Sequence, residues 1–348
     1  MQQRVQELAM DGQDPPVRYI QREPDRPIVV PSPRSPIPTV DLGLVFESDG
    51  GEIGKLKSAL QSWGLFQAIG HGIPNSVLDE VRNITREFFK LPVEEKQRYS
   101  NVIEGGKEPG LEGYGTDRVA SEDQILDWSD RLYLLVEPEN ERKPIFWPEK
   151  PSSFRTALHE YTTMARLLTN NVLKAMAKMV DLDESYFVQK FDQKAEVYAR
   201  FNYYPPCSRP ELVFGLKPHN DATVITIVVP DEEVEGLQVL KDGEWVTVPT
   251  VPHALIINMG DFMEIMSNGM FKSPVHRAVT NPAKERISVA MFYSLEADKV
   301  IEPAEGLVDE KRPRLYKKVT RKGYHDLFWE DFRQGKRTID QIKVSNTE

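Results

Sequence analysis

The chain has 348 residues, of which 40% are hydrophobic, enough for one large domain or two small ones with a sizeable core. Its 54 acidic residues outnumber its 44 basic ones, for a formal net charge of −10. Because no basic tract is long enough to form a phosphate-binding face, nucleic acid is not an expected partner. Cys207 is the one cysteine, which excludes an internal disulfide and predicts a reducing compartment.

The N-terminal stretch shows no sign of export. Residues 1–16 carry charges and lack the apolar core of a secretory signal, and no later run is long enough to cross a bilayer. We therefore expect a cytoplasmic protein that does not bind membranes.

Short helices and extended chain are predicted for the first 100 residues. Residues 4–10 can form a helix that Pro15 and Pro16 end, and further prolines up to residue 38 predict an extended connector across the surface. The pattern then predicts strands at 39–42 and 65–69 and helices near 54–62, 76–89 and 91–96. We expect residues 1–100 to form a region that packs on the core.

A loop and one long helix are expected next. Residues 101–118 are rich in glycine and polar groups, which predicts a mobile loop over the mouth of a pocket, and a strand is expected at 132–136. Over residues 152–182 apolar side chains recur at spacings of three and four, which predicts a scaffold helix packed along a sheet. The stripe consists of Phe154, Leu158, Tyr161, Ala165, Leu168, Val172, Ala175 and Met179.

Short β runs dominate the following hundred residues. They are 197–204, 223–229, 237–239, 245–248, 254–258, 263–266, 276–279 and 287–293. Many strands with tight turns, such as Asp242-Gly243, predict a closed or two-sheet β architecture with flanking helices, an α+β fold that is mainly β in its core. We assign the core to residues 101–310. We assign residues 311–348 to a C-terminal helical segment that returns against the N-terminal part.

A candidate metal site begins with His219 and Asp221, two residues apart in a β-branched run, which would put both on one strand face. His276 follows 57 residues later (276 minus 219) on a second strand-like run. Two imidazoles and one carboxylate form the facial triad of non-haem Fe(II) oxygenases. A His-x-Asp pair alone is more often packed or exposed than metal-binding, so the interpretation depends on the residues after His276.

Arg286 and Ser288 come after His276 and a turn-forming segment, again two apart and so on one strand face. The arginine fork can grip a carboxylate with two hydrogen bonds, and the serine hydroxyl adds a third donor. A hairpin would fold this pair back beside His276. The combination predicts a carboxylate site next to the metal.

His-x-Asp, a distant His and Arg-x-Ser together resemble the Fe(II)- and 2-oxoglutarate-dependent dioxygenases, and the chain is similar to their plant branch. Asn220, where these enzymes commonly have Ser or Thr, and Gly70, where they commonly have Asn, depart from the pattern. The chain is similar to anthocyanidin synthase/flavonol synthase-like enzymes and to a subgroup that hydroxylates triketone herbicides. Further landmarks are IPTVDL at 37–42, WGLFQAIGHGI at 63–73, LPVEEK at 91–96, LDWSD at 126–130, NYYPPC at 202–207 and GDFMEIMSNG at 260–269.

The resemblance implies a double-stranded β-helix, or jelly roll, with a catalytic region at about 195–298. It implies a monomer that uses Fe(II), 2-oxoglutarate and O2, with ascorbate as reductant, and that releases succinate and CO2. The substrate would be a small aromatic or enolic metabolite, hormone or xenobiotic, hydroxylated or, where the attacked carbon bears oxygen, demethylated. The implied Fe(II) ligands are His219, Asp221 and His276, and the implied 2-oxoglutarate contacts are Arg286, Ser288, Tyr204 and Asn202.

The resemblance also assigns a substrate pocket. Two arginines beside an aromatic pair predict an anionic or enolic substrate stacked on the rings. The alternative is that Arg131 pairs with Asp130 or Glu137 at the rim and faces solvent. The residues assigned to the pocket are Arg131, Tyr133, Arg200, Phe292 and Ser294.

Three other functions compete with this interpretation. A zinc hydrolase could use the same three ligands, but it needs a general base near the metal and has no use for Arg286 and Ser288. A non-catalytic binding protein of the same fold typically loses one member of the triad, and all three are present. An ascorbate-dependent oxidase of this fold tends to differ around Tyr204.

Overall fold

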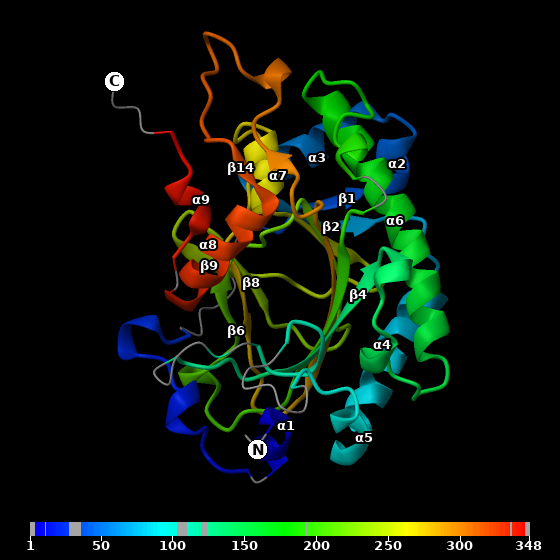
Figure 1. Cartoon of the computed structure of the whole chain (residues 1–348), viewed down its shortest axis with the longest axis vertical. Helices are drawn as coiled ribbons and strands as arrows, with labels where there is room; N and C mark the ends of the chain where they lie inside the picture. The colour runs from blue at the N-terminus through cyan, green and yellow to red at the C-terminus, as the bar shows by residue number, and fades with distance from the viewer. Residues whose placement is uncertain are drawn as a thin grey trace.

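Two β-sheets facing each other form the body of the molecule (Figure 1). The computed structural model describes residues 4–10, 12–27, 36–102, 110–117, 119, 124–191, 194–334 and 336–344. In spatial order the larger sheet contains β1 (Thr39–Asp41), β2 (Leu65–Ile69), β10 (Leu255–Met259), β7 (Ile225–Pro230), β12 (Arg286–Tyr293), β5 (Val197–Tyr204), β4 (Asp130–Glu137) and β3 (Gly113–Gly115). The smaller sheet contains β6 (Phe214–His219), β11 (His276–Val279), β8 (Leu237–Lys241) and β9 (Glu244–Thr247).

The strand pairing is antiparallel throughout both sheets except between β1 and β2. The fold is a jelly roll, as expected. β1 and β2 extend the large sheet next to β10, so the N-terminal region contributes strands to the same sheet as the core. The division into three regions stays a prediction.

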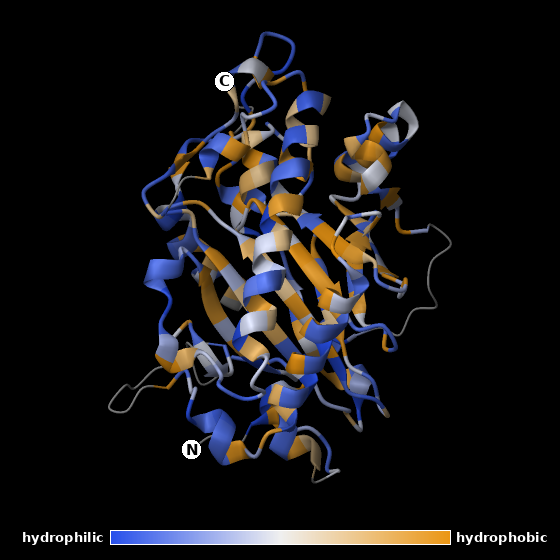
Figure 2. Cartoon of the chain, turned by 90° about the vertical axis from the view of Figure 1, so that its right-hand side faces the viewer, coloured by the Kyte–Doolittle hydropathy of each residue, from blue (hydrophilic) through white to orange (hydrophobic). Residues whose placement is uncertain are grey.

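Helices cover the outer face of the large sheet, on the right of Figure 1. The long helix α6 (Phe154–Met179) packs against α4 (Asn75–Lys90), which contacts β12, and against α2 (Leu42–Phe46) and α3 (Gly50–Ser62). Figure 2 shows α6 crossing in front of hydrophobic strands. All members of the predicted apolar stripe except Ala175 are buried, which confirms the scaffold helix. None of the helices in the described ranges is long and apolar enough to cross a membrane.

The segment predicted as a strand at 263–266 is a helix, α7 (Asp261–Met266). All six of its residues are buried, and periodicity alone does not distinguish a short buried strand from a short buried helix. Tertiary contacts decide the outcome: Asp261 N donates to Asp221 O (2.8 Å) and Phe262 N donates to Thr223 O (3.0 Å). A Cβ at Gly260 would lie 2.1 Å from Thr223 O, so only glycine permits this approach.

The predictions for the loop at 101–118 and for the C-terminal segment need correction. In the predicted mobile loop, residues 103–109 and 118 lie outside the described residues, whereas 113–115 form strand β3. The C-terminal helix α8 (Arg321–Gln334) does not return against the N-terminal part. It packs instead on α7, where Tyr324 Oη donates to Asp261 Oδ2 (2.6 Å), and on the loop between β6 and β7, where His325 Nε2 lies 3.2 Å from Ala222 O.

Smaller elements complete the chain. The predicted N-terminal helix is present as α1 (Val5–Met10). The others are α5 (Val93–Gln97), α9 (Thr338–Gln341) and the two-stranded sheet of β13 (Val300–Ile301) and β14 (Val319–Thr320).

Candidate active site

Three potential metal ligands meet where strands of the small sheet end. His219 is the last residue of β6 and His276 the first of β11, and the two are directly paired in register. Asp221 does not share a strand face with His219, as the period of two predicted, because β6 ends at His219 and residues 220–224 form a turn into β7. The turn brings its carboxylate back to the imidazoles: Asp221 Oδ1 lies 3.7 Å from Nε2 of each histidine.

Hydrogen bonds orient both imidazoles. Nδ1 of His219 lies 2.8 Å from Lys217 O, and Nδ1 of His276 lies 3.1 Å from Pro274 O. Since a carbonyl oxygen only accepts, each Nδ1 carries the proton and each Nε2 offers a free lone pair. Burial, together with the neighbouring imidazole of His276, lowers the pKa of His219, so its ring is neutral and able to bind a metal.

The carboxylate of Asp221 is held in the same way. Its Oδ2 accepts from Thr226 Oγ1 (2.7 Å) and Asn258 Nδ2 (2.8 Å), which leaves Oδ1 facing the histidines. Burial by itself raises the pKa of Asp221, but the two imidazoles and these hydrogen bonds outweigh burial and lower it. The charge and donor set suit a divalent metal.

A candidate carboxylate site lies in the same cavity as the triad. Arg286 and Ser288 lie on β12 directly opposite Tyr204 and Asn202 on β5. The expected hairpin with His276 is absent, because β11 and β12 belong to different sheets and the turn after β11 crosses between them. All four side chains line one cavity with the triad.

Arg286 is a buried cation without an anionic partner. It is 5% exposed, its Nε has no hydrogen-bond partner, and no ion pair joins it to a carboxylate in the described part of the chain. Its guanidinium lies 5.1 Å from the centre of the Tyr204 ring. A Cβ at Gly236 would lie 2.9 Å from Arg286 Cδ, so this glycine makes room for the arginine. An unpaired buried guanidinium is unfavourable unless a ligand carboxylate completes it.

Asn202 and Ser288 are partly satisfied by each other. Asn202 Nδ2 donates to Ser288 Oγ (3.2 Å), while Asn202 Oδ1 accepts from Arg200 Nε (2.7 Å). The serine hydroxyl keeps its own proton to donate to a ligand.

An aromatic cavity adjoins the triad on its open side. Tyr133 and Phe292, both predicted to line it, stack with ring centres 6.1 Å apart. Helix α8 supplies an aromatic wall that sequence reasoning missed, although the spacing of Phe328, Trp329 and Phe332 in one helix was a usable signal. Phe332 reaches the metal site, 5.8 Å from His219 between ring centres. The cavity is lined by Asp117, Tyr133, Arg200, Leu216, His219, Asp221, Ala222, Thr223, Phe292, His325, Phe328, Trp329 and Phe332.

Two residues assigned to the substrate pocket lie elsewhere. Ser294 is buried, and its hydroxyl accepts from Arg321 Nε (3.3 Å). Arg131 is 2% exposed and donates from Nη1 to Leu111 O (2.7 Å) and Gly113 O (3.0 Å). Arg131 therefore fastens the segment around β3. The alternative prediction, that Arg131 faces solvent at the rim and pairs with Asp130 or Glu137, is also wrong. Arg131 is buried, and its ionic partner is Asp117.

Arg200 lines the cavity as predicted, but it is not free. Asp117 accepts from Arg200 Nη1 (3.0 Å) and Nη2 (2.8 Å), and its Oδ1 also accepts from Arg131 Nε (3.1 Å). Both arginines that were predicted to receive an anionic or enolic substrate therefore bind Asp117. No local pattern identified Asp117, because its partners are 14 and 83 residues away in sequence.

The unusual Asn220 ties the C-terminal segment to the metal loop. Its Oδ1 accepts from Arg337 Nε (3.0 Å) and its Nδ2 donates to Ser273 O (2.9 Å), while Arg337 Nη2 also donates to Ser273 O (3.3 Å). Arg337 follows α8 in the chain. This contact therefore fixes the far end of the helix that forms the aromatic wall.

We expect Arg337→Ala to raise the KM for the organic substrate about fivefold, since two hydrogen bonds between neutral acceptors and a cation are lost and the aromatic wall loosens. Iron binding and substrate-free turnover of 2-oxoglutarate should not change. Steady-state kinetics against the neighbouring Lys336→Ala variant, which changes an exposed residue, check the effect. An unchanged KM in Arg337→Ala would show that the contact does not support the pocket.

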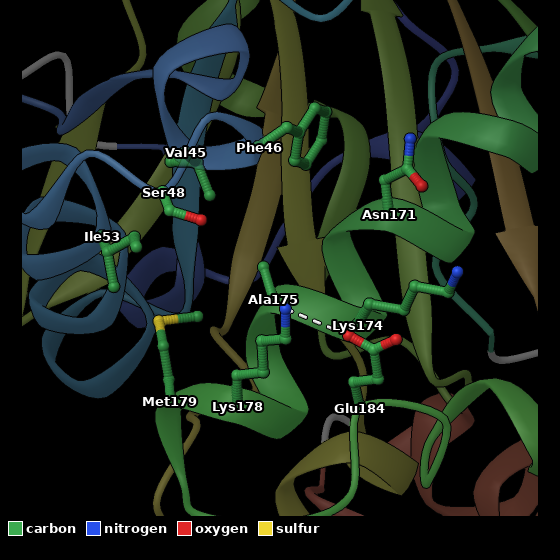
Figure 3. A pocket seen from close by; sticks show the side chains of 10 residues that line it. All are labelled: Val45, Phe46, Ser48, Ile53, Asn171, Lys174, Ala175, Lys178, Met179 and Glu184. Atoms are coloured by element: carbon green, nitrogen blue, oxygen red, sulfur yellow. Dashed lines mark ion pairs between the residues drawn. The ribbon is translucent and has the colours of Figure 1, made fainter.

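Two other features of the described residues are weaker candidates for a functional site. Asp79, Glu232 and His253 cluster, but Arg82 Nη1 lies 3.1 Å from Asp79 and 3.0 Å from Glu232, so a guanidinium already supplies the cation. Figure 3 shows a separate hollow between α2, α3 and the end of α6, where Lys178 pairs with Glu184 (3.0 Å). Neither contains an unpaired buried charge like Arg286.

The two histidines and the aspartate would hold a divalent metal, and Arg286 offers an unpaired cation in the same cavity to the carboxylate of an acidic cosubstrate. This arrangement defines the class of non-haem oxygenases that use 2-oxoglutarate. Comparisons with known proteins agree: residues 196–295 match the 2OG-Fe(II) oxygenase superfamily, and residues 37–150 match the N-terminal family described as non-haem dioxygenase in morphine synthesis.

Relatives match over nearly the whole chain. Lateral branching oxidoreductase 1 of Arabidopsis thaliana is 39% identical, covering 95% of this chain and 92% of that protein. Oxoglutarate-dependent flavonoid 7-O-demethylase 1 of Ocimum basilicum is 36% identical, covering 98% and 91%. The crystal structure of JOX2 in complex with 2OG, Fe and JA is 35% identical, with a TM-score of 0.89 over 99% of this chain and 98% of that one.

The chain belongs to the 2OG-Fe(II) oxygenase superfamily and is a 2-oxoglutarate-dependent dioxygenase. Its cofactors are Fe(II) and 2-oxoglutarate, which sets aside the zinc hydrolase, the binding protein and the ascorbate-dependent oxidase as alternatives.

Proposed function

We propose that this dioxygenase binds Fe(II) through His219, Asp221 and His276 and oxidises a small, flat organic molecule held in the aromatic cavity. The distal carboxylate of 2-oxoglutarate would pair with Arg286 and Ser288, beside Tyr204. The observation that carries this assignment is the buried guanidinium of Arg286, unpaired among the described residues, in the cavity that contains the triad.

Each part of the site has a distinct task. Iron with 2-oxoglutarate supplies O2-dependent oxidation of an unactivated C–H bond, with release of succinate and CO2. Lys217 O and Pro274 O hold the imidazole tautomers, and Thr226 and Asn258 hold the carboxylate of Asp221. Arg286 fixes the cosubstrate from its far end. The aromatic side chains of β4, β12 and α8 orient the substrate and exclude water from the reaction.

The cavity and the relatives together indicate the substrate class. Tyr133, Phe292 and Trp329 present ring faces and edges to a planar conjugated molecule. The relatives include enzymes named for flavonoid and codeine O-demethylation and for jasmonate induction. We therefore propose a phenolic metabolite, hormone or xenobiotic as substrate, hydroxylated or, where the attacked carbon carries an oxygen, demethylated.

Turnover of isotope-labelled 2-oxoglutarate tests the assignment. Labelled succinate should form slowly with Fe(II) alone and several-fold faster when a phenolic or hormone from a broad panel is a substrate. Absence of Fe(II)-dependent succinate under all conditions would contradict the proposal. The cytoplasmic location and the monomeric state stay predictions, and cell fractionation and light scattering test them.

A further inference from the structure

The charged end of the aromatic cavity is closed by a carboxylate of the chain itself. Asp117 lines this cavity and forms two parallel hydrogen bonds with Arg200, at 3.0 and 2.8 Å, and a third with Arg131 at 3.1 Å. The Asp117 side chain is 20% exposed, and those of Arg200 and Arg131 are 10% and 2% exposed. The carboxylate thus occupies the place between the two guanidinium groups where an acidic substrate would otherwise bind.

The remaining donors of the two arginines leave little for a second anion. Arg200 Nε is used by Asn202, and Arg131 Nη1 is used by the carbonyl groups of Leu111 and Gly113. Burial raises the pKa of Asp117, but Arg200 and Arg131 outweigh burial and hold that pKa well below its usual range. The two guanidinium groups thus favour the ionised form of Asp117.

We propose that Asp117 determines charge selectivity, so that the active site takes a neutral conjugated molecule with a polar oxygen in preference to the carboxylate form of the same skeleton. The inference rests on the proposed function, in which this cavity holds the substrate.

The physical reason is the state of the arginines before substrate arrives. A carboxylate that approached Arg200 would either lie within a few ångströms of Asp117, with strong repulsion in a cavity of low dielectric constant, or displace Asp117 and leave it partly buried without a partner. A neutral carbonyl, ether or hydroxyl oxygen can accept one of the guanidinium N–H groups that Asp117 and Asn202 leave open, because an arginine has five donors. A hydroxyl group can also donate to Asp117.

The experiment compares matched pairs of ligands. Carboxylic acids and their methyl esters on benzene, naphthalene and indole skeletons are titrated calorimetrically into anaerobic protein loaded with Fe(II) and 2-oxoglutarate. Wild-type protein should bind the ester at least tenfold more tightly in the pairs that bind. In Asp117→Asn, which keeps the shape and removes the charge, the acid-to-ester ratio of affinities should shift at least tenfold toward the acid.

Asp127→Asn is the matched control. Asp127 is a nearby aspartate whose side chain is 8% exposed and accepts from Lys217 N (2.9 Å), and it does not line the aromatic cavity. Its removal should leave the ratio unchanged. A purely structural role for Asp117 would weaken acid and ester alike, so the ratio separates charge selection from loop stability.

Three outcomes overturn the proposal: a wild-type preference for the acids, an Asp117→Asn ratio equal to that of wild type, or no binding by any pair. Should Asp117→Asn fail to fold, the wild-type preference and the acid-to-ester ratio of an Asp117→Ser variant still test the charge selectivity.

Fe(II)-dependent release of succinate without substrate is measured in the same preparations. Its absence would refute the proposed function instead, whereas its presence with an unchanged ratio would refute the charge selectivity alone.

Discussion

Replacement of any one of His219, Asp221 and His276 by alanine is expected to abolish iron binding and 2-oxoglutarate turnover together. Each side chain supplies one of three protein bonds to the metal, and the three donor atoms lie within 4.8 Å of one another. Loss of one ligand leaves two, too few to hold Fe(II) against water at a site built for a facial triad. We expect turnover to fall by a factor of about 1,000 or more, as is common when a catalytic group is removed.

Iron content after anaerobic loading and release of labelled succinate measure the two effects separately. His159→Ala is the matched control, because His159 is an exposed histidine on α6 far from the triad in the fold. Asp221→Asn should retain the fold, since an amide can still accept a hydrogen bond from Thr226. Near-normal turnover in two of the three alanine variants would refute the metal assignment.

Arg286→Lys is expected to raise the requirement for 2-oxoglutarate by about 30-fold while leaving the KM for the organic substrate within a factor of about two. An ammonium group keeps the charge but cannot reproduce the two parallel hydrogen bonds of a guanidinium. The lost charge-assisted bond corresponds to about 2 kcal/mol. Lysine also loses the stacking over the Tyr204 ring, which lies 5.1 Å from the guanidinium.

The measurement is the KM for 2-oxoglutarate at saturating Fe(II), with the KM for the organic substrate as internal reference. Arg312→Lys is a suitable control, because Arg312 is an exposed arginine whose ionic partner is Asp309. An unchanged cosubstrate KM in Arg286→Lys would show that Arg286 binds a different group, and the 2-oxoglutarate site would then have to be sought elsewhere in the cavity.

Strand periodicity predicted that Arg286 and Ser288 share one face of their strand, and both line the cavity, because β12 is regular and its period of two survives in the sheet. The same argument misplaced Asp221, since β6 ends at His219 and the following turn carries Asp221. The residue pattern also misassigned 263–266 as a strand, because the hydrogen bonds from Asp261 and Phe262 to the loop before β7 select a helix. Periodicity predicts which side chains share a face within a strand or helix. It does not predict the residue at which tertiary contacts end that strand or helix.

The amino-acid sequence by itself determined the jelly-roll class, the scaffold helix α6 and the His219, Asp221 and His276 group, because these depend on residue type, local spacing and motifs. The residues proposed to bind 2-oxoglutarate stay a prediction from the same motifs. Only the tertiary structure decided the character of the substrate cavity. The pairing of Asp117 with Arg200 joins residues 83 apart, and the aromatic wall comes from a helix that lies beyond the last core strands in the chain. Contacts between distant segments depend on how the whole chain packs, so no local pattern specifies them.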